Sequence, residues 1–587
     1  MPNTRKKRRP NKKRNLVKKK GTKKKISKDY EILDFFAMPK KNRQKYLNKF
    51  SKLSPFEFKD TLLKRAAIGA GPILNVGRGN PNFLNSFCRN IFAKLQLMAV
   101  ELSNEISKDL VIYPQLDEYN YEQVMIKKAR SWSQEERSFL INYIKFLNKK
   151  ATAEGISKKE VLYDIIKSTL GCFYPVPPQI QQHLGLVCQE FMYDLVMRAN
   201  HLEDKDTKQL EGLKMNPHDF DFFATEGAAA GILYVFNTLS ENFLVNPGDS
   251  IAIITPIFSP YLEMPKLADY GERIVRLHGD PDNNYSLSDE EINKLKDKRI
   301  KALFMVNPTN PSSYSLSKSN IDKIGHIVNT ERQDLIVLSD NVYAPFANQY
   351  NSFMLTCPRN TIEVFSLSKY FGTTGWRLGV IMVAKENRIN NLFKKLPFKK
   401  TKALRARYEI GAYAPDDLTF MERLVFDSRQ VAEEHVAGLS TPQQVLIGLF
   451  MFYELNDKDD NYNRSIKTIL RDRITKFYNP LKTNPHIEPT STNYYNLLFI
   501  PEIAENLYGK DARKYLEQNY DANEFLLHIS LKYKVILLPG KGFGADNWRL
   551  RVSLANMATD QYEKVGIKIR DCIHEFVKPA LKQAIKP

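Results

Sequence analysis

The chain is poor in the features that mark secreted, membrane-spanning and metal-binding proteins. Its 587 residues hold an odd number of scattered cysteines and no Cys-x-x-Cys pair: Cys88, Cys172, Cys188, Cys357 and Cys572. This pattern argues against a disulfide framework and a structural zinc site, so no metal is expected, and it favours a reducing compartment such as the cytoplasm. No run approaches the roughly 18 apolar residues of a transmembrane segment, and no apolar core of a secretory signal follows the basic start.

Residues 1–28 have no acidic side chain, yet they carry 15 lysines and arginines. Taking these charges from the net charge of +22 leaves +7, so the rest of the chain is only mildly basic. Like charges at this density repel, and residues 1–29 are therefore expected to form a disordered basic tail. Such a tail can contact polyanions, namely nucleic acid or an anionic membrane, and it resembles a nuclear-localisation patch. A solvated appendage without a partner is the equal alternative.

Short apolar runs alternate with helical stretches from about residue 220. They are rich in β-branched or aromatic residues and lack strict alternation, which is typical of strands covered by helices on both faces. The predicted class is α/β, with a mostly parallel central sheet wrapped by helices. The predicted strands are Ile251–Thr255, Ala302–Val306, Leu335–Ser339, Ile362–Phe365 and Gly379–Ala384.

The remaining regions predict a helical insertion and a smaller α+β lobe. Residues 30–65 and 90–170 have mostly helical patterns, and after a long helix the C-terminal region has strand candidates at Tyr494–Phe499, Val535–Leu538 and Leu550–Leu554. The predicted domains after the tail are an N-terminal segment of the small domain (30–90), a helical insertion and linker (91–215), a large α/β domain (216–440) and a C-terminal small domain (441–587).

The segment from Ser366 to Gly379 combines parts that one kind of chemistry requires. Lys369 comes just after a predicted strand, two serines precede it, and Arg377 follows eight residues later among three glycines. A lysine that forms a Schiff base must be reachable, partly desolvated and close to a phosphate clamp. The segment therefore predicts an enzyme that uses pyridoxal 5'-phosphate, with Lys369 as its catalytic residue.

Other loops at the carboxyl ends of predicted strands carry suitable polar side chains, where α/β sheets bind ligands. Asp340 is suited to hold the pyridine nitrogen protonated, which makes the ring an electron sink. Asn310 and Tyr343 are candidates for the phenolic oxygen of the cofactor. Phosphate contacts are expected from Ser366, Ser368 and Arg377, and from a helix that opens at Gly227 and Ala228.

The order of these residues resembles the fold-type I aminotransferases of class I and II. A closer resemblance is to the branch of aspartate 4-decarboxylases that are bifunctional with aspartate aminotransferase, and it runs from about residue 30 to the C-terminus. The segments that carry it are Gly77-Arg78-Gly79-Asn80-Pro81-Asn82-Phe83-Leu84, Tyr174-Pro175-Val176-Pro177-Pro178, Thr255-Pro256-Ile257-Phe258-Ser259-Pro260-Tyr261, Lys369-Tyr370-Phe371-Gly372-Thr373-Thr374-Gly375-Trp376-Arg377 and Gly438-Leu439-Ser440-Thr441-Pro442-Gln443-Gln444.

The resemblance implies further site residues. Arg551 would bind the substrate α-carboxylate, although Arg549 lies two positions away on the same strand face. Phe258 matches the aromatic side chain that stacks on the cofactor ring, and Tyr174 the tyrosine lent to the partner subunit's phosphate. Arg78 and Gly79 are expected at the substrate, Arg78 on its distal carboxylate. Gly227-Ala228-Ala229 departs from the Gly-Gly-Thr more usual in that branch, which removes a hydroxyl.

The expected function is conversion of L-aspartate to L-alanine and CO2, accompanied by aspartate aminotransferase activity. The resemblance also implies a homo-oligomer, at least a dimer and possibly a larger ring. One alternative is an aminotransferase of the same fold acting on another amino acid. Another is a nucleic-acid- or membrane-tethered protein with a degenerate cofactor domain, which the presence of both Lys369 and Asp340 argues against.

Overall fold

The computed structural model describes residues 39–50, 53–68, 70–106, 112–175, 180–199, 216–264, 273–429, 438–485 and 487–583. The chain divides into two units, Met1–Lys52 and Leu53–Pro587. The first unit contributes helix α1 (Lys40–Leu47), and the predicted basic tail lies outside the described residues. No helix among the described residues is long and apolar enough to cross a membrane.

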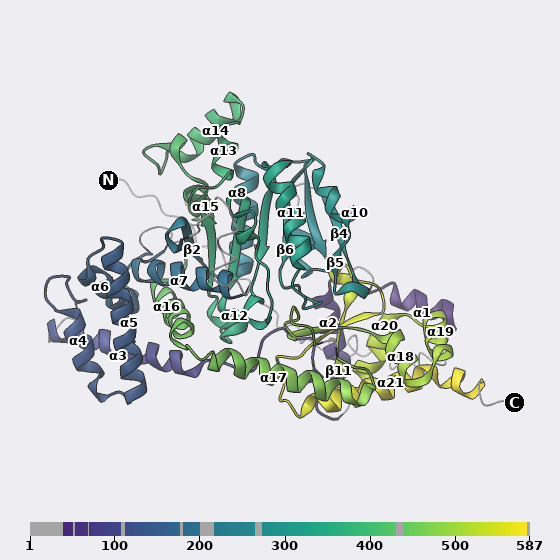
Figure 1. The fold of residues 1–587 in the computed structure, drawn as a ribbon. Coiled ribbons are helices and arrows are strands. Elements are labelled where there is room, and N and C mark those ends of the chain that lie inside the picture. Colours follow the sequence, from purple (N-terminus) through teal and green to yellow (C-terminus); the bar gives the residue numbers. More distant parts are fainter. Residues whose placement is uncertain are drawn as a thin grey trace, which may run out of the picture. The chain divides into compact units, whose positions relative to one another are not determined.

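The centre of the second unit is a large mixed sheet whose described strands run in the order β2-β9-β8-β7-β6-β3-β4-β5 (Figure 1). Neighbours from β8 to β4 pair in parallel, whereas β9 runs antiparallel to both β2 and β8, and β5 antiparallel to β4. The strands are β2 (Phe220–Thr225), β3 (Ser250–Thr255), β4 (Arg273–Asp280), β5 (Ser286–Leu287), β6 (Ile300–Val306), β7 (Ile336–Asp340), β8 (Thr361–Ser366) and β9 (Gly379–Ala384).

The predicted α/β class and mostly parallel sheet are confirmed. Every residue of β3, β7, β8 and β9 is buried, as expected for strands covered on both faces. The sequence prediction missed β2, β4 and β5. Strand β4 lies next to the sheet edge and exposes much of its length, so it lacks the continuous apolar run that revealed the central strands.

Helices cover the sheet, and α8 (Ala228–Glu241) packs against β2, β8 and β9. Its apolar face buries Ile232, Val235, Phe236 and Leu239 at helical spacing. The other helices of this region are α9 (Pro260–Glu263), α10 (Asp289–Asn293), α11 (Lys318–Thr330), α12 (Leu367–Tyr370), α13 (Ile389–Phe393), α14 (Phe398–Tyr408) and α15 (Phe420–Arg429).

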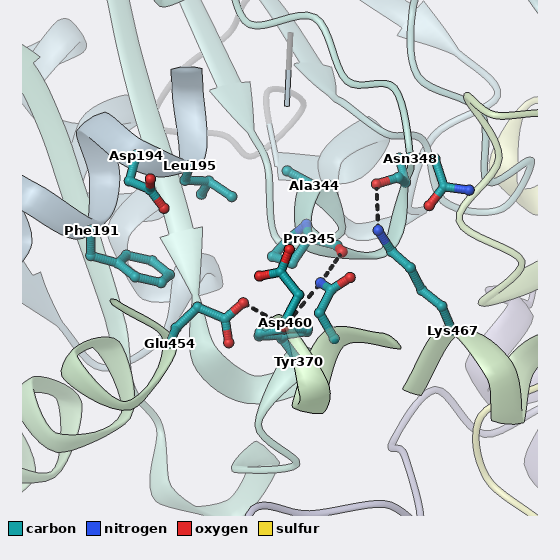
Figure 2. A pocket seen from close by; sticks show the side chains of 12 residues that line it. Phe191, Asp194, Leu195, Ala344, Pro345, Asn348, Tyr370, Glu454, Asp460 and Lys467 are labelled. Carbon is teal, nitrogen blue, oxygen red and sulfur yellow. Dashed lines mark hydrogen bonds between the residues drawn. The ribbon is translucent and has the colours of Figure 1, made fainter. Parts of the chain in front are cut away.

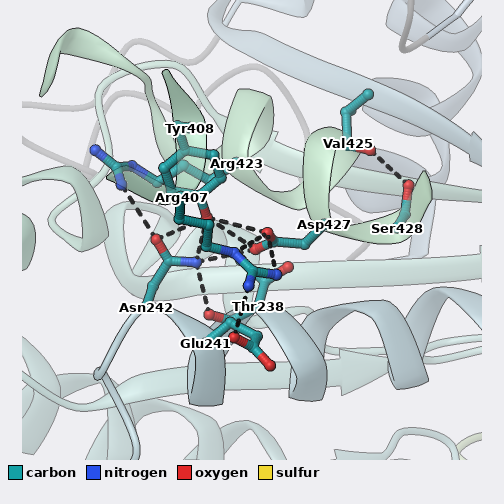
Figure 3. Close-up of polar contacts among 9 residues, drawn as sticks. All are labelled: Thr238, Glu241, Asn242, Arg407, Tyr408, Arg423, Val425, Asp427 and Ser428. Atoms are coloured by element: carbon teal, nitrogen blue, oxygen red, sulfur yellow. Dashed lines mark hydrogen bonds and ion pairs between the residues drawn. The ribbon is translucent and has the colours of Figure 1, made fainter. Parts of the chain in front are cut away.

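A buried polar network holds the C-terminal end of α8 to α14 and α15 (Figure 3). The Asn242 amide donates to the Asp427 carboxylate at 3.0 Å and to the Tyr408 hydroxyl at 2.7 Å. Arg407 pairs with Glu241 at 2.8 Å. Burial raises the pKa of Asp427, but the facing guanidinium of Arg407 keeps its charge paired. The network fixes the far end of the helix whose N-terminus reaches the predicted phosphate site.

The region before the sheet is helical. It comprises α2 (Pro55–Ala66), α3 (Ser86–Ile106), α4 (Tyr121–Lys128), α5 (Gln134–Ala153), α6 (Lys158–Leu170) and α7 (Gln182–Ala199). Helices α3, α6 and α7 pack against α16 from the C-terminal region. Capping boxes begin both α2, at Ser54, and α5, at Ser133. These caps satisfy the first amides of each helix and explain why the helices begin at these residues.

The C-terminal region combines helices with two small sheets. Strands β10 and β12 flank β13 antiparallel, and β1 pairs with β11 in parallel. Its elements are α16 (Thr441–Asn456), α17 (Asn461–Tyr478), β10 (Tyr495–Phe499), α18 (Ile500–Tyr508), α19 (Lys510–Asn519), α20 (Ala522–His528), β11 (Val535–Ile536), β12 (Leu538–Pro539), β13 (Arg549–Ser553) and α21 (Gln561–Gln583), with β1 (Leu74–Asn75) from the N-terminal part.

Candidate active site

Parallel strands bring three of the predicted site residues to one edge of the large sheet. Asp340 ends β7, Lys369 lies in the short helix α12 directly after β8, and Asn310 follows β6. Ser366 caps α12, because its hydroxyl accepts the Ser368 amide at 3.2 Å and donates to the Leu378 carbonyl at 3.1 Å. This cap turns the chain sharply at the end of β8 and presents the lysine at the carboxyl edge.

The Asp340 carboxylate is buried, with 3% of the residue exposed. It accepts the Tyr261 hydroxyl at 2.9 Å and the Val342 amide at 3.1 Å, and no ion-pair partner exists for it in the described part of the chain. Burial raises its pKa to about 6, although both hydrogen bonds and Lys369 act in the opposite direction. A buried acid without a cation is a site for a cationic ring nitrogen.

Lys369 is half-buried, and its amine donates to the Gly79 carbonyl at 2.9 Å. The Tyr494 hydroxyl donates to the same carbonyl, also at 2.9 Å. The backbone of Gly79, which the resemblance places at the substrate, therefore lies directly against the lysine.

One end of the site, the phosphate end, consists of Gly227, Ala228, Ser368 and Arg377. Gly227 precedes α8 with a φ of 88°, and no side chain caps the first turn of that helix. This positive φ favours glycine, and a β-carbon at residue 227 would lie 2.6 Å from Nη2 of Arg377, so the end of the arginine side chain would have to shift. Arg377 is exposed, whereas Ser368 is buried beside the Ser366 hydroxyl at 3.0 Å. An uncapped helix start beside an arginine is a ready anion site.

The opposite end, the carboxylate end, consists of Arg551, Asn310, Tyr343 and Tyr495. Arg551 on β13 is 1% exposed, and it donates to the Asn310 side-chain oxygen at 3.0 Å and to the Gly77 carbonyl at 2.9 Å. Among the described residues no acid pairs with it, and its Nε has no hydrogen-bond partner. Burial lowers the pKa of Arg551. An arginine desolvated in this way favours an incoming carboxylate.

The neighbouring Arg549 has a different environment. It pairs with Asp546 at 3.3 Å and stacks on the Phe499 ring at 4.8 Å. Arg551 instead donates to Asn310 and to the Gly77 carbonyl, two residues before Gly79. The structure therefore favours Arg551 over Arg549 as the carboxylate ligand.

Aromatic side chains lie beside Asp340 and Arg551: Tyr261 bonds to Asp340, and Tyr495 stacks on Arg551. The Tyr343 hydroxyl lies 3.1 Å from the Tyr495 hydroxyl, and burial raises the pKa of Tyr343 well above its ordinary value. Phe258 is half-buried and contacts Phe56 and Tyr261 edge to face, with ring centroids 5.7 and 5.3 Å apart.

Two predicted residues lie at the surface of the single chain. Tyr174 is 72% exposed, and Arg78 is exposed without an acid partner among the described residues. The ligand predicted for Tyr174 is the phosphate in a partner subunit, and the ligand predicted for Arg78 is the distal carboxylate of the substrate. Both assignments stay predictions.

A separate cavity of about 290 Å³ is lined by Tyr370 of α12, by α7, by the segment after Asp340 and by α16 and α17 (Figure 2). None of the predicted site residues lines it. At its wall Tyr370 donates to Glu454 at 2.8 Å and Lys467 to the Ala347 carbonyl at 3.0 Å. Burial lowers the pKa of Lys467 to about 8. These contacts brace the segment that carries Tyr343 from outside the site.

The residues present fit a pyridoxal phosphate. Asp340 provides a buried anion, the start of α8 beside Arg377 provides an anion site, and Lys369 provides an amine whose charge acts on Asp340. The sequence did not predict four other residues that contact this site, namely Tyr261, Tyr494, Tyr495 and Phe543. The adjacent Tyr494 and Tyr495 open a predicted strand, but only the observed pairing of β10 with β13 brings Tyr495 to Arg551.

Comparisons with known proteins identify the family of the chain. Residues 223–568 match the family model for aminotransferases of class I and II. The chain is 38% identical over 534 residues to the bifunctional aspartate aminotransferase and L-aspartate beta-decarboxylase of a Pseudomonas species, a match that covers 89% of this chain and 96% of that one.

Solved structures show the same fold at low sequence identity. A double mutant of the Thermus thermophilus aspartate aminotransferase aligns with a TM-score of 0.54 at 15% identity, over 90% of this chain and 97% of that one. The same organism's enzyme with maleate aligns with a TM-score of 0.52 at 14% identity, over 91% and 98%. The chain therefore belongs to the class I and II aminotransferases, which are fold-type I enzymes that use pyridoxal 5'-phosphate.

Proposed function

We propose that the protein converts L-aspartate to L-alanine and CO2, with accompanying aspartate aminotransferase activity. The observation that carries the proposal is the buried, unpaired guanidinium of Arg551 within the same site as Lys369 and Asp340. It favours a substrate with a carboxylate next to its amine. The relative from Pseudomonas, similar over most of both chains, carries both activities in its name.

The cofactor, when bound, supplies an electron sink for loss of the α-proton and of the side-chain carboxylate. In this proposal the Asp340 carboxylate keeps the ring nitrogen protonated. Burial raises the pKa of Asp340, and the positive charge of the protonated nitrogen would lower it again. Asn310 and Tyr343 hydrogen-bond the phenolic oxygen, and Phe258 lies against the ring. Phosphate contacts come from Gly227, Ala228, Ser366, Ser368 and Arg377.

The substrate would be held at both carboxylates. Arg551 fixes the α-carboxylate by charge-assisted hydrogen bonds, and Gly79 contacts the substrate. Lys369, once its amine is released, is the group that takes the α-proton as a general base. Arg78, exposed on the loop beside Gly79, is the proposed ligand of the distal carboxylate, and it must release this group before CO2 leaves.

The balance between the two activities would depend on water. Hydrolysis before CO2 is lost would give oxaloacetate and leave the amino group with the cofactor, for transfer to a 2-oxo acid. Loss of CO2 followed by protonation would give alanine. Side chains that exclude water from the carboxylate end therefore favour alanine.

The site would also need a second copy of the chain. Tyr174 is 72% exposed in one chain, and we propose that it contacts the phosphate bound in a partner subunit. Mixing subunits that carry Lys369→Ala with subunits that carry Tyr174→Ala tests this sharing. Hybrid dimers should recover part of the activity that each variant lacks. If hybrid dimers form but show no activity, the shared site is refuted. A larger ring remains an expectation.

The decisive experiment incubates the purified full chain with pyridoxal phosphate, L-aspartate and a 2-oxo acid that accepts the amino group, and it measures alanine, CO2 and oxaloacetate in parallel. Other amino acids replace aspartate in a second series. Alanine and CO2 should form in equal amounts and exceed oxaloacetate, while Lys369→Ala should form neither. Keto acid without CO2 would replace the proposal by an aminotransferase of aspartate, and activity only with other amino acids by one of different specificity.

A further inference from the structure

Tyr495 contacts three groups of the site, although nothing in the sequence pattern pointed to it. It begins β10 and is 2% exposed. Its hydroxyl lies 3.1 Å from the Tyr343 hydroxyl, and its ring centroid lies 4.4 Å from the guanidinium carbon of Arg551. The register of β10 and β13 explains the second contact, because Leu497 faces Arg551 directly and Tyr495 is the diagonal neighbour on the same face.

The Tyr495 hydroxyl also fills the space beside Gly79. A β-carbon at residue 79 would lie 2.5 Å from this oxygen and 3.6 Å from the Lys369 amine. The hydroxyl and the catalytic amine therefore flank the same glycine. Tyr495 thus lies between the residues proposed to bind substrate and those proposed to bind the cofactor.

The ring of Tyr495 compensates for the burial of Arg551. Tyr495 and Phe543 both lie against the guanidinium, with the Phe543 centroid at 5.0 Å, and no acid pairs with it among the described residues. The negative faces of aromatic rings attract a cation, and the attraction is stronger when the cation is desolvated. Loss of one ring face leaves Arg551 less favourably placed and freer to move.

The Tyr343 and Tyr495 hydroxyls together have two protons, but the single hydrogen bond between them uses only one. Each hydroxyl can donate once, and within the described part of the chain the two hydroxyls have no hydrogen-bond partner except each other. One proton is therefore left without an acceptor in a buried place. An acceptor that arrives in the site completes the pair if Tyr495 donates to Tyr343 and Tyr343 donates to the newcomer.

We infer that Tyr495 is a positioning residue with two separable tasks: its ring holds Arg551 for the substrate carboxylate, and its hydroxyl orients the Tyr343 proton toward the phenolic oxygen of the cofactor. This inference rests on the proposed function. Hydrogen bonds in a chain strengthen one another, so the Tyr343 contact is stronger when Tyr495 donates to it.

The test uses the full chain loaded with pyridoxal phosphate and compares Tyr495→Phe with Tyr495→Leu. The first variant removes only the hydroxyl, and the second also removes the ring. Phe499→Leu is the matched control, since Phe499 lies on the same strand and stacks on Arg549 and Arg513 instead. Two quantities are measured: the dissociation constant of maleate, an unreactive dicarboxylate, and the pH midpoint of the visible absorbance change of the bound cofactor.

Tyr495→Phe should leave maleate affinity within about twofold and raise the pH midpoint by roughly half a unit, because the phenolate form of the cofactor loses support. Tyr495→Leu should weaken maleate binding about tenfold or more. Phe499→Leu should change neither quantity. Phe543→Leu, which removes the other ring face, should also weaken maleate binding and serves if Tyr495→Leu does not fold.

An unchanged or lowered midpoint in Tyr495→Phe would overturn the hydroxyl's task. Wild-type maleate affinity in a folded Tyr495→Leu, or in Phe543→Leu when Tyr495→Leu does not fold, would overturn the ring's task. Both results leave the proposed function intact. The proposed function itself fails if the wild-type protein gains no visible band with pyridoxal phosphate or does not bind maleate.

Discussion

The two ends of the site differ in how complete they are within one chain. At the carboxylate end, Arg551 and Asn310 are buried and bonded to each other. At the phosphate end, Arg377 is exposed, and among the described residues its guanidinium donates only to the nearby Thr374 carbonyl, at 3.1 Å. Substitutions at the carboxylate end therefore disturb a packed structure, whereas those at the phosphate end remove contacts that form only with a ligand or partner.

The largest expected effect is at the carboxylate end. Arg551→Leu should lower kcat/KM for aspartate by about 100-fold or more, because the substrate carboxylate would be buried without its charged partner. Steady-state kinetics with aspartate measure the change.

Arg549→Leu is the control for this substitution. It removes an arginine from the same strand and face, and it should change kcat/KM less than about threefold, because the ion pair of Arg549 with Asp546 is exposed on the acid side. If Arg549→Leu is the more damaging change, the carboxylate ligand has been assigned two residues too far along β13.

At the phosphate end the expected effect is smaller and of another kind. Arg377→Leu should raise the dissociation constant of pyridoxal phosphate roughly 10- to 100-fold, the value of one or two charge-assisted hydrogen bonds. Turnover at saturating cofactor should fall much less. An absorbance titration with cofactor measures the affinity, and Arg359→Leu, an arginine outside the site, is the control. Equal losses of affinity in both variants would contradict the phosphate assignment.

The sequence predicted the strand-end residues better than the contacts between distant segments. Asp340, Lys369 and Arg377 follow buried strands whose apolar runs are plain, so their place at the carboxyl edge could be inferred. Tyr495 meets Arg551 only through the pairing of β10 with β13, and Gly79 meets both through a loop more than 400 residues away from Tyr495 along the chain. Register and long-range packing of this kind leave no local pattern. Strand β4 was missed for a related reason, since a half-exposed strand near an edge has no continuous apolar run.

Asp340 allows a test of stability that separates fold from function. Burial raises its folded pKa to about 6 from 3.8, so the folded cofactor-free protein binds more protons than the unfolded chain between these values. Its stability therefore falls as pH rises from about 4 to 6, and the loss stays in full above pH 6. Asp340→Asn should stabilise the cofactor-free protein at pH 7.5, by on the order of 2 kcal/mol, and hardly at pH 4.

Thermal unfolding with and without pyridoxal phosphate checks this prediction. The cofactor should stabilise the wild-type protein more than Asp340→Asn, because only the carboxylate pairs with a protonated ring nitrogen. A variant that is less stable than the wild type at pH 7.5 without cofactor would show that the carboxylate serves the fold rather than the cofactor.

The smallest effect is expected at Gly79, which lies against the Tyr495 hydroxyl. The φ of Gly79 lies outside the left-handed region, so the backbone permits alanine. Of the three nearest atoms, the Tyr495 hydroxyl alone is too close to the added β-carbon, at 2.5 Å. Gly79→Ala should lower kcat/KM about tenfold, as overpacking costs about 1–3 kcal/mol. Adding Tyr495→Phe removes the obstructing oxygen, so the double variant should return to within a few-fold of Tyr495→Phe alone. Strictly additive losses would instead show that Gly79 is needed for the approach of substrate, and not to make room for Tyr495.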